Sequence, residues 1–141
     1  MTSTYFMKCL LFNVFDQPGS QNATYPLPET YYIGLSTTEP DQMGDNIGEP
    51  STGAGYERVK ISIVGSYNNA TNRPVVVNGN VIEFGECLSD WGEVTHYVIF
   101  DAEKGGNMLL YGALDSPRQI SVGSIFSIDV GGLRITVEND T

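Results

Sequence analysis

The chain of 141 residues carries 17 acidic side chains against seven Lys and Arg, for a formal net charge of −10 and an isoelectric point near 4.2. The few cations are scattered, which argues against nucleic-acid backbones and anionic membrane surfaces as partners. The length suits one domain that needs no metal or disulfide to fold, and the many Gly, Asn, Ser and Thr favour an all-β class.

The first expected element is a helix over residues Thr4 to Phe15. Ser3 or Thr4 can cap its start, and Pro18-Gly19 ends it. Further apolar side chains surround this helix, so it is expected either to be well buried or to pack against a partner chain. Its apolar face is given by residues at the spacing i, i+3, i+4, i+7: Met7, Leu10, Leu11 and Val14.

Strands are expected from residue 31 onward. Alternating patterns in "YYIGLSTTEP" and "YERVKISIVG" predict two strands, separated by a polar Gly-rich loop over residues 41–55. In "VVVNGNVIEF", the Asn78-Gly79 pair predicts a tight type I′ hairpin. Two more hairpins are expected, one turning at "EKGG" and one at the Gly-Gly of "IFSIDVGGLRITVE".

The pattern as a whole predicts a mainly β fold: an antiparallel β-sandwich or flattened barrel of seven or eight strands, with one N-terminal α-helix. We expect residues 1–18 to form the helix and its cap, residues 19–30 a connector, and residues 31–141 a single β-sandwich domain. No stretch approaches the length of a membrane span. A signal peptide is not expected at the start either, because Lys8 interrupts the apolar run.

The stretch "WGEVTHYVIFDA" holds the only Trp and the only His of the sequence, close to an acidic residue. In a strand, His96 and Asp101 fall on opposite faces, so they cannot form a catalytic relay with each other. His96 is therefore expected to be a structural or interface histidine. Trp91 either packs in the core or faces a partner or ligand.

No cofactor is predicted, because no Gly-rich phosphate loop or zinc-ligand spacing is present. Asp41, Asp45 and Glu49 are weak candidates for a cation site, but their spacing does not match a calcium-binding loop. A solvated surface loop is the simpler expectation. Cys9 and Cys87 stand in different settings, and two buried thiols are expected rather than a disulfide.

Three phrases in order resemble a family of small phage virion structural proteins, described as tail-fibre-like or capsid-accessory. They are "YYIGLSTTEP", then "GEPSTGAGYERVKI", then "WGEVTHYVIFDAEKGGNMLLYGAL" followed by "VGSIFSIDVGGLRITVE". The resemblance extends from about Thr4 to Glu138. It implies a non-enzymatic subunit of a virion assembled in the host cytoplasm, positioned at the tail fibre or neck, or decorating the capsid.

The resemblance also implies contacts with other virion proteins, and we expect a homo-oligomer, with a trimer favoured. Candidate interface residues are the aromatics of the helix together with the single tryptophan: Tyr5, Phe6, Phe12, Phe15 and Trp91. One alternative is a carbohydrate-binding module that contacts the host cell surface, with Trp91 or Tyr56 stacking on sugar rings. Another is a small hydrolase, which would need two close carboxylates in a cleft.

Overall fold

A computed structural model describes residues 1–16, 24–68 and 73–135. The helix stop expected at Pro18-Gly19 and residues 19–23 of the connector lie outside this part of the chain. The helices are α1 (Thr4–Leu11), a π-helical turn η1 (Phe12–Asp16) and a 3₁₀ turn η2 (Thr52–Ala54). The strands are β1 (Tyr31–Ser36), β2 (Val59–Ile61), β3 (Ile63–Asn68), β4 (Arg73–Asn78), β5 (Ile82–Glu83), β6 (Gly92–Phe100), β7 (Met108–Ile120), β8 (Ser127–Ile128) and β9 (Arg134–Ile135).

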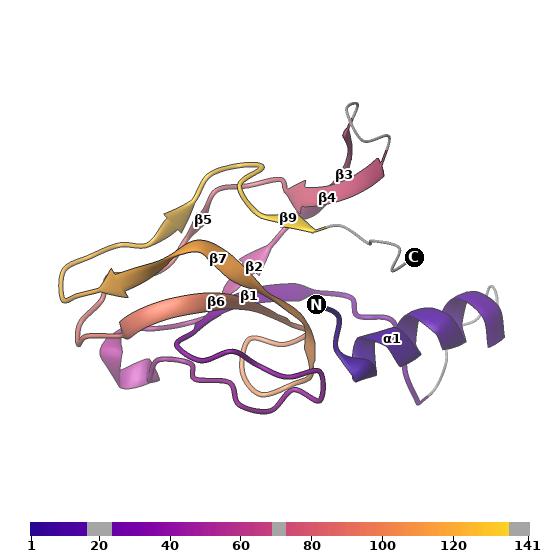
Figure 1. Cartoon of the computed structure of the whole chain (residues 1–141), viewed down its shortest axis with the longest axis horizontal. Coiled ribbons are helices and arrows are strands. Elements are labelled where there is room, and N and C mark those ends of the chain that lie inside the picture. Colours follow the sequence, from indigo (N-terminus) through magenta and orange to yellow (C-terminus); the bar gives the residue numbers. More distant parts are fainter. Residues whose placement is uncertain (17–23, 69–72, 136–141) are drawn as a thin grey trace.

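The strands form three antiparallel sheets, as Figure 1 shows. The largest has the order β2-β1-β6-β7, the second β3-β4-β9, and β5 pairs with β8 alone. The sheets are layered without closing into a barrel, so the predicted antiparallel sandwich with an N-terminal α-helix is confirmed.

The main core fills the space on one face of the four-stranded sheet. Ile33, Leu35 and Ile99 of the central strands are at most 1% exposed, and they belong to the same cluster as Trp91 and Phe84. Antiparallel sheets commonly pack one face on a core and leave the other to solvent. Here the second face is apolar too, and a loop covers part of it.

That cover comes from the Gly-rich loop, which the sequence predicted to be a solvated surface loop. Ile47 packs on a second cluster made by Val98, Phe100, Met108 and Tyr111. The buried Ser36 hydroxyl holds the loop in place. It donates to the Thr38 carbonyl at 2.6 Å and accepts the Gly48 N–H at 3.0 Å. The prediction was therefore wrong for the middle of this loop, although Asp41 and Asp45 are exposed.

The hairpin predicted at "EKGG" is confirmed: β6 and β7 pair antiparallel, and Gly105 and Gly106 adopt positive φ in the turn between them. The hairpin predicted at Asn78-Gly79 is wrong. Strand β4 pairs with β3 and β9, whereas β5 pairs with β8. The same pairings show that the second Gly-Gly hairpin is wrong as well, because β8 and β9 lie in different sheets.

The contacts of the Asn78 side chain explain why the hairpin predicted at Asn78-Gly79 does not form. Its side chain is fully buried and donates to the carbonyls of Asn80 and Asp129, while its oxygen accepts the Leu133 N–H at 2.9 Å. A type I′ turn would place this side chain at a hairpin tip with φ positive. The structure instead uses it to join two distant segments where the chain passes from one sheet to the next.

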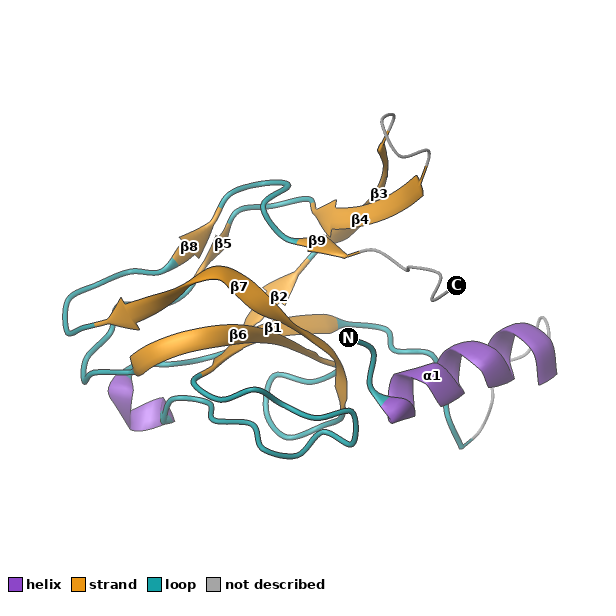
Figure 2. Ribbon diagram, in the orientation of Figure 1, coloured by secondary structure: helices purple, strands orange, loops and turns teal. Residues whose placement is uncertain are grey.

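The N-terminal residues extend the edge of the four-stranded sheet. The Met1 ammonium donates to the Tyr111 carbonyl at 2.6 Å, and Thr2 forms a β-bridge with Leu110. Ser3 then caps α1 by accepting the Phe6 N–H at 3.1 Å. From this anchor the helix runs outward, beyond the sheets, as seen in Figure 2.

Candidate functional site

The helix exposes its apolar side to solvent. We call the set of Met7, Leu10, Leu11, Val14 and Phe15 the apolar helix face; these side chains are between 38% and 76% exposed. Four of the five are the residues that the sequence pattern placed on one face. Of the two alternatives drawn from that pattern, burial of this face within the chain is wrong, because the face is uncovered.

The opposite side of the helix packs inward through polar as well as aromatic contacts. Cys9 is completely buried, and the Asn13 amide donates to the carbonyls of Cys9 and Tyr25, each at 2.7 Å. The Tyr25 ring lies 5.8 Å from that of Tyr5 and 5.6 Å from that of Phe12. The helix is thus held by residues near its start and by the segment around Tyr25, and its apolar face is left free.

The aromatic interface candidates separate into two groups. Tyr5 and Phe6 are half-buried and pack against the main core, and burial, together with a hydrogen bond to Cys9, raises the pKa of Tyr5 to about 12. Phe12 is 37% exposed at the edge of the Tyr25 contact, and Phe15 is 76% exposed. Phe15 is therefore the candidate that the structure leaves most open to a partner.

Trp91 lies in the core. It is 4% exposed, its indole N–H donates to the Ala54 carbonyl at 2.9 Å, and its ring stands edge-on to Tyr56 at 5.4 Å. Tyr56 itself is 3% exposed and stacks on Phe84. This burial favours the core alternative for Trp91, and neither ring offers a face on which a sugar could stack.

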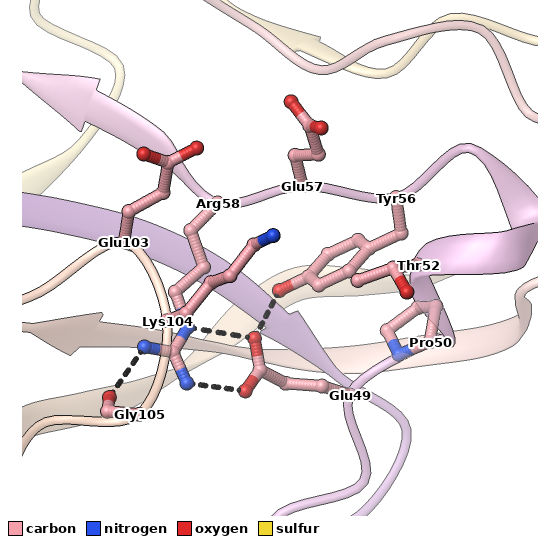
Figure 3. A pocket seen from close by; sticks show the side chains of 9 residues that line it. All are labelled: Glu49, Pro50, Thr52, Tyr56, Glu57, Arg58, Glu103, Lys104 and Gly105. Atoms are coloured by element: carbon pink, nitrogen blue, oxygen red, sulfur yellow. Dashed lines mark hydrogen bonds and ion pairs between the residues drawn. The ribbon is translucent and has the colours of Figure 1, made fainter.

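Arg58 organises a polar cluster beside a surface hollow of about 300 Å³ (Figure 3). Its guanidinium binds the Glu49 carboxylate through two nitrogens, at 3.0 and 2.7 Å, and donates to the carbonyls of Ala102 and Gly105. It also stacks 3.5 Å from the centre of the Phe100 ring. One side chain therefore joins the Gly-rich loop, the start of β2 and the β6–β7 turn.

The Tyr56 hydroxyl completes this cluster by donating to the Glu49 carboxylate at 2.5 Å. Burial, and then the negative charge of Glu49, raise the pKa of Tyr56. Gly34 on the neighbouring strand makes room for the contact, because a Cβ there would come within 2.5 Å of the hydroxyl oxygen. Alternation in "YERVKISIVG" places Tyr56 and Arg58 on one strand face, but no local sequence pattern indicated that Glu49 of the Gly-rich loop meets them.

The weak metal candidates are not brought together. Glu49 is engaged by Arg58, whereas Asp41 accepts the backbone N–H groups of Met43 and Asp45, each at 2.9 Å. Within residues 1–16, 24–68 and 73–135, no group of three or more His, Cys, Asp or Glu is arranged to hold a metal ion. Asp41 and Asp45 thus act as loop-forming residues here.

His96 and Asp101 are also kept apart, as expected. The His96 Nδ1 lies 2.8 Å from the Thr95 hydroxyl, and Asp101 accepts the Asn107 N–H in the β6–β7 turn. Cys9 and Cys87 are both free and buried, which confirms the expectation of two buried thiols. Among the described helices, none has the length and apolar character needed to cross a membrane.

The fold and the helix define a class: a small, mainly β protein that exposes a large apolar patch, a feature typical of surfaces that contact other proteins. A family model described as podophage GP4 fiber I protein gp80 matches residues 3–136. The chain therefore belongs to this family of podophage fibre proteins. The resemblance drawn from the three sequence phrases is confirmed. A search of curated proteins finds no match to the chain.

Membership of this family makes the chain a structural fibre protein of a phage and a component of the virion, associated with other virion components.

Proposed function

We propose that this chain is a non-enzymatic fibre subunit that attaches to its virion partners through the apolar helix face. For its place on the virion, we favour the tail fibre or neck, and the capsid surface comes second. Assembly takes place in the host cytoplasm. The observation that carries the proposal is the exposure of five large apolar side chains on one side of a projecting helix.

The size of this face supports an interface. Large side chains have roughly 200 Å² of surface when fully exposed. At their observed exposures, the five therefore leave on the order of 500 Å² of apolar surface in one patch, comparable with the largest patches found on monomers. The face contains no charged residue in a chain of net charge −10, so close approach of another acidic chain is least opposed here.

We further propose that copies of the chain associate as a trimer. A patch on the order of 500 Å² is smaller than the roughly 800 Å² per partner of a standard stable interface. Two chains joined by their helices alone would therefore hold together weakly. In a trimer each helix packs on two neighbours, and the β bodies contribute the remaining contact area.

The test measures the mass of the full chain in solution by light scattering. Wild-type protein is expected at three times the 15.4 kDa chain mass. The double variant Leu11→Gln/Val14→Gln, which retains good helix formers, is expected to be monomeric. The matched control is Val130→Gln, an equally exposed apolar residue on the body, and it is expected to leave the mass unchanged. A wild-type chain that stays monomeric at high concentration contradicts the trimer.

The two alternatives from the sequence gain no support from the site. A carbohydrate module built on Trp91 or Tyr56 lacks its stacking faces, because both rings lie in the core. A hydrolase would need a free carboxylate pair in a cleft. In the hollow beside Arg58, Glu49 is already bound on both oxygens, so it is not free to form such a pair with Glu57 or Glu103, which line the same hollow.

A further inference from the structure

A second and larger hollow shares no lining residue with the hollow beside Arg58. Its volume is about 510 Å³, within the range of small-ligand sites. It lies between the β6–β7 pair and the segment that carries β8 and β9. We call it the β7–β9 groove; its lining is Tyr97, residues 113–116, Arg118, residues 126–129 and residues 132–134.

A bulge in β7 builds one wall of the groove. Arg118 pairs with Val94 and Ala113 pairs with His96, so residues 114–117 of β7 stand opposite the single residue Thr95. Extra residues on one strand leave the ladder and bend the strand away from its partner. The side chains of Asp115 and Ser116 line the groove from this excursion.

The floor is aromatic. Tyr97 pairs in register with Gly112, and a Cβ at Gly112 would come within 2.5 Å of the Tyr97 hydroxyl oxygen, so the glycine lets the ring lie across β7. Among the described residues this hydroxyl has no hydrogen-bond partner, so it can donate to a bound group. Phe126, in edge contact with Phe84, forms the facing side.

The lining includes two exposed arginines, Arg118 and Arg134, for which no partner is found among the described residues. Arg118 and Arg134 are exposed, and neither side chain makes an ion pair or hydrogen bond with any described residue. Arg58, by contrast, is bound by a carboxylate and two carbonyls. Two of the seven cations of an acidic chain thus line one groove without a partner in residues 1–16, 24–68 and 73–135, together with Asp115 and Asp129.

We propose that the β7–β9 groove binds an acidic oligosaccharide, with Arg118 and Arg134 recognising the sugar carboxylates. The planar guanidinium fork matches a carboxylate through two parallel hydrogen bonds.

The other lining residues suit the rest of the sugar. Asp115, Asp129 and Ser116 offer acceptors and a donor for sugar hydroxyls, and the Tyr97 and Phe126 rings contact the apolar faces of the sugar. Two cations within a net charge of −10 are too few for a nucleic-acid backbone.

This site goes beyond the assembly role proposed above and does not depend on it, because none of its residues belongs to the apolar helix face.

The test titrates the full chain with hexagalacturonate and, separately, with neutral maltohexaose, followed by calorimetry. Hexagalacturonate is expected to bind at least about tenfold more tightly, with an affinity that falls as salt is added. The double variant Arg118→Gln/Arg134→Gln is expected to weaken this binding at least about tenfold. The control Lys60→Gln removes an exposed cation on β2 and leaves binding unchanged.

A thermal melt of each variant shows whether it is folded; all three substituted side chains are exposed, so the midpoint is expected to stay within a few degrees of wild type. Equal affinity for both sugars, no binding of either, or full retention of binding in the arginine variant would each overturn the proposal. Tighter binding of a hexaglutamate peptide than of hexagalacturonate would also overturn it, and would assign the groove to an acidic peptide segment.

Discussion

The centre of the β body and the N-terminal helix use apolar side chains in opposite ways. In the body, Tyr56, Phe84 and Trp91 are at most 4% exposed and contact one another edge-on or stacked. On the helix, Leu11 and Phe15 are 55% and 76% exposed. Burial stabilises the first group within one chain, whereas the second group stays in contact with water in the single chain.

Taken with the attachment proposed for the apolar helix face, the difference predicts that stability and assembly rest on separate residues in this protein. Substitutions in the body should change the free energy of unfolding and leave the association of folded chains intact. Substitutions on the apolar helix face should do the reverse. The substitutions below test whether the free energy of unfolding changes for body residues and stays the same for the apolar helix face.

The largest effect is expected for Trp91→Ala. Truncation removes the ring from the aromatic cluster, leaves a cavity, and deprives the Ala54 carbonyl of its indole donor. The free energy of unfolding should fall by about 3–5 kcal/mol. Urea denaturation followed by circular dichroism measures this, since the variant lacks the tryptophan signal. A loss below about 1 kcal/mol would mean that the ring is not the centre of the core.

A smaller loss is expected for Arg58→Met, which removes the cation and leaves the Glu49 carboxylate unpaired. Breaking a buried pair costs about 3–5 kcal/mol, and because Glu49 is 21% exposed the loss here should be about 2–3 kcal/mol. Chemical denaturation at neutral pH measures it. The control Arg118→Met, at an exposed arginine without a partner among the described residues, should change stability by less than about 0.5 kcal/mol.

The pair itself can be tested by adding Glu49→Gln to Arg58→Met. Removing both charges leaves no uncompensated carboxylate, so the double variant should recover part of the stability lost in the single one. The Glu49→Gln single variant is measured as well. If the double variant loses as much stability as the two single variants together, Glu49 and Arg58 act independently, which contradicts the bidentate contact.

Local signals in the sequence predicted local structure well. The "EKGG" turn was found because its glycines lie between two alternating strands, and the pairing of β6 with β7 needs nothing else. The helix face was also found, because its spacing is contained within eight residues. The number of alternating strand segments in the sequence predicted the β-sandwich class.

The failures involve contacts between segments distant along the chain. Asn78-Gly79 carries a strong hairpin signal, but the Asn78 side chain binds Asp129 and Leu133, and these long-range hydrogen bonds override the local preference. Arg58 and Glu49 meet only because a loop without periodicity folds over the sheet. Periodicity also could not say whether the helix face is covered, since that depends on where the helix lies.

The smallest change in stability is expected on the apolar helix face. In dilute solution, where chains are separate, Leu11→Gln/Val14→Gln should alter the free energy of unfolding by less than about 0.5 kcal/mol, because both side chains already contact water and Gln favours helix. Asn13→Ala, on the inward side of the same helix, should cost about 1–3 kcal/mol, because it removes two hydrogen bonds from a residue that is 7% exposed.

Denaturation curves measured on the two variants at equal low concentration compare the two sides of the helix directly. A loss of several kcal/mol in the outward variant would show that the face is covered within a single chain, and the separation between stability and assembly would then fail. A loss confined to the Asn13 variant would mean that the outward face contributes nothing to the fold. Its five large apolar residues would then be available for association, as proposed.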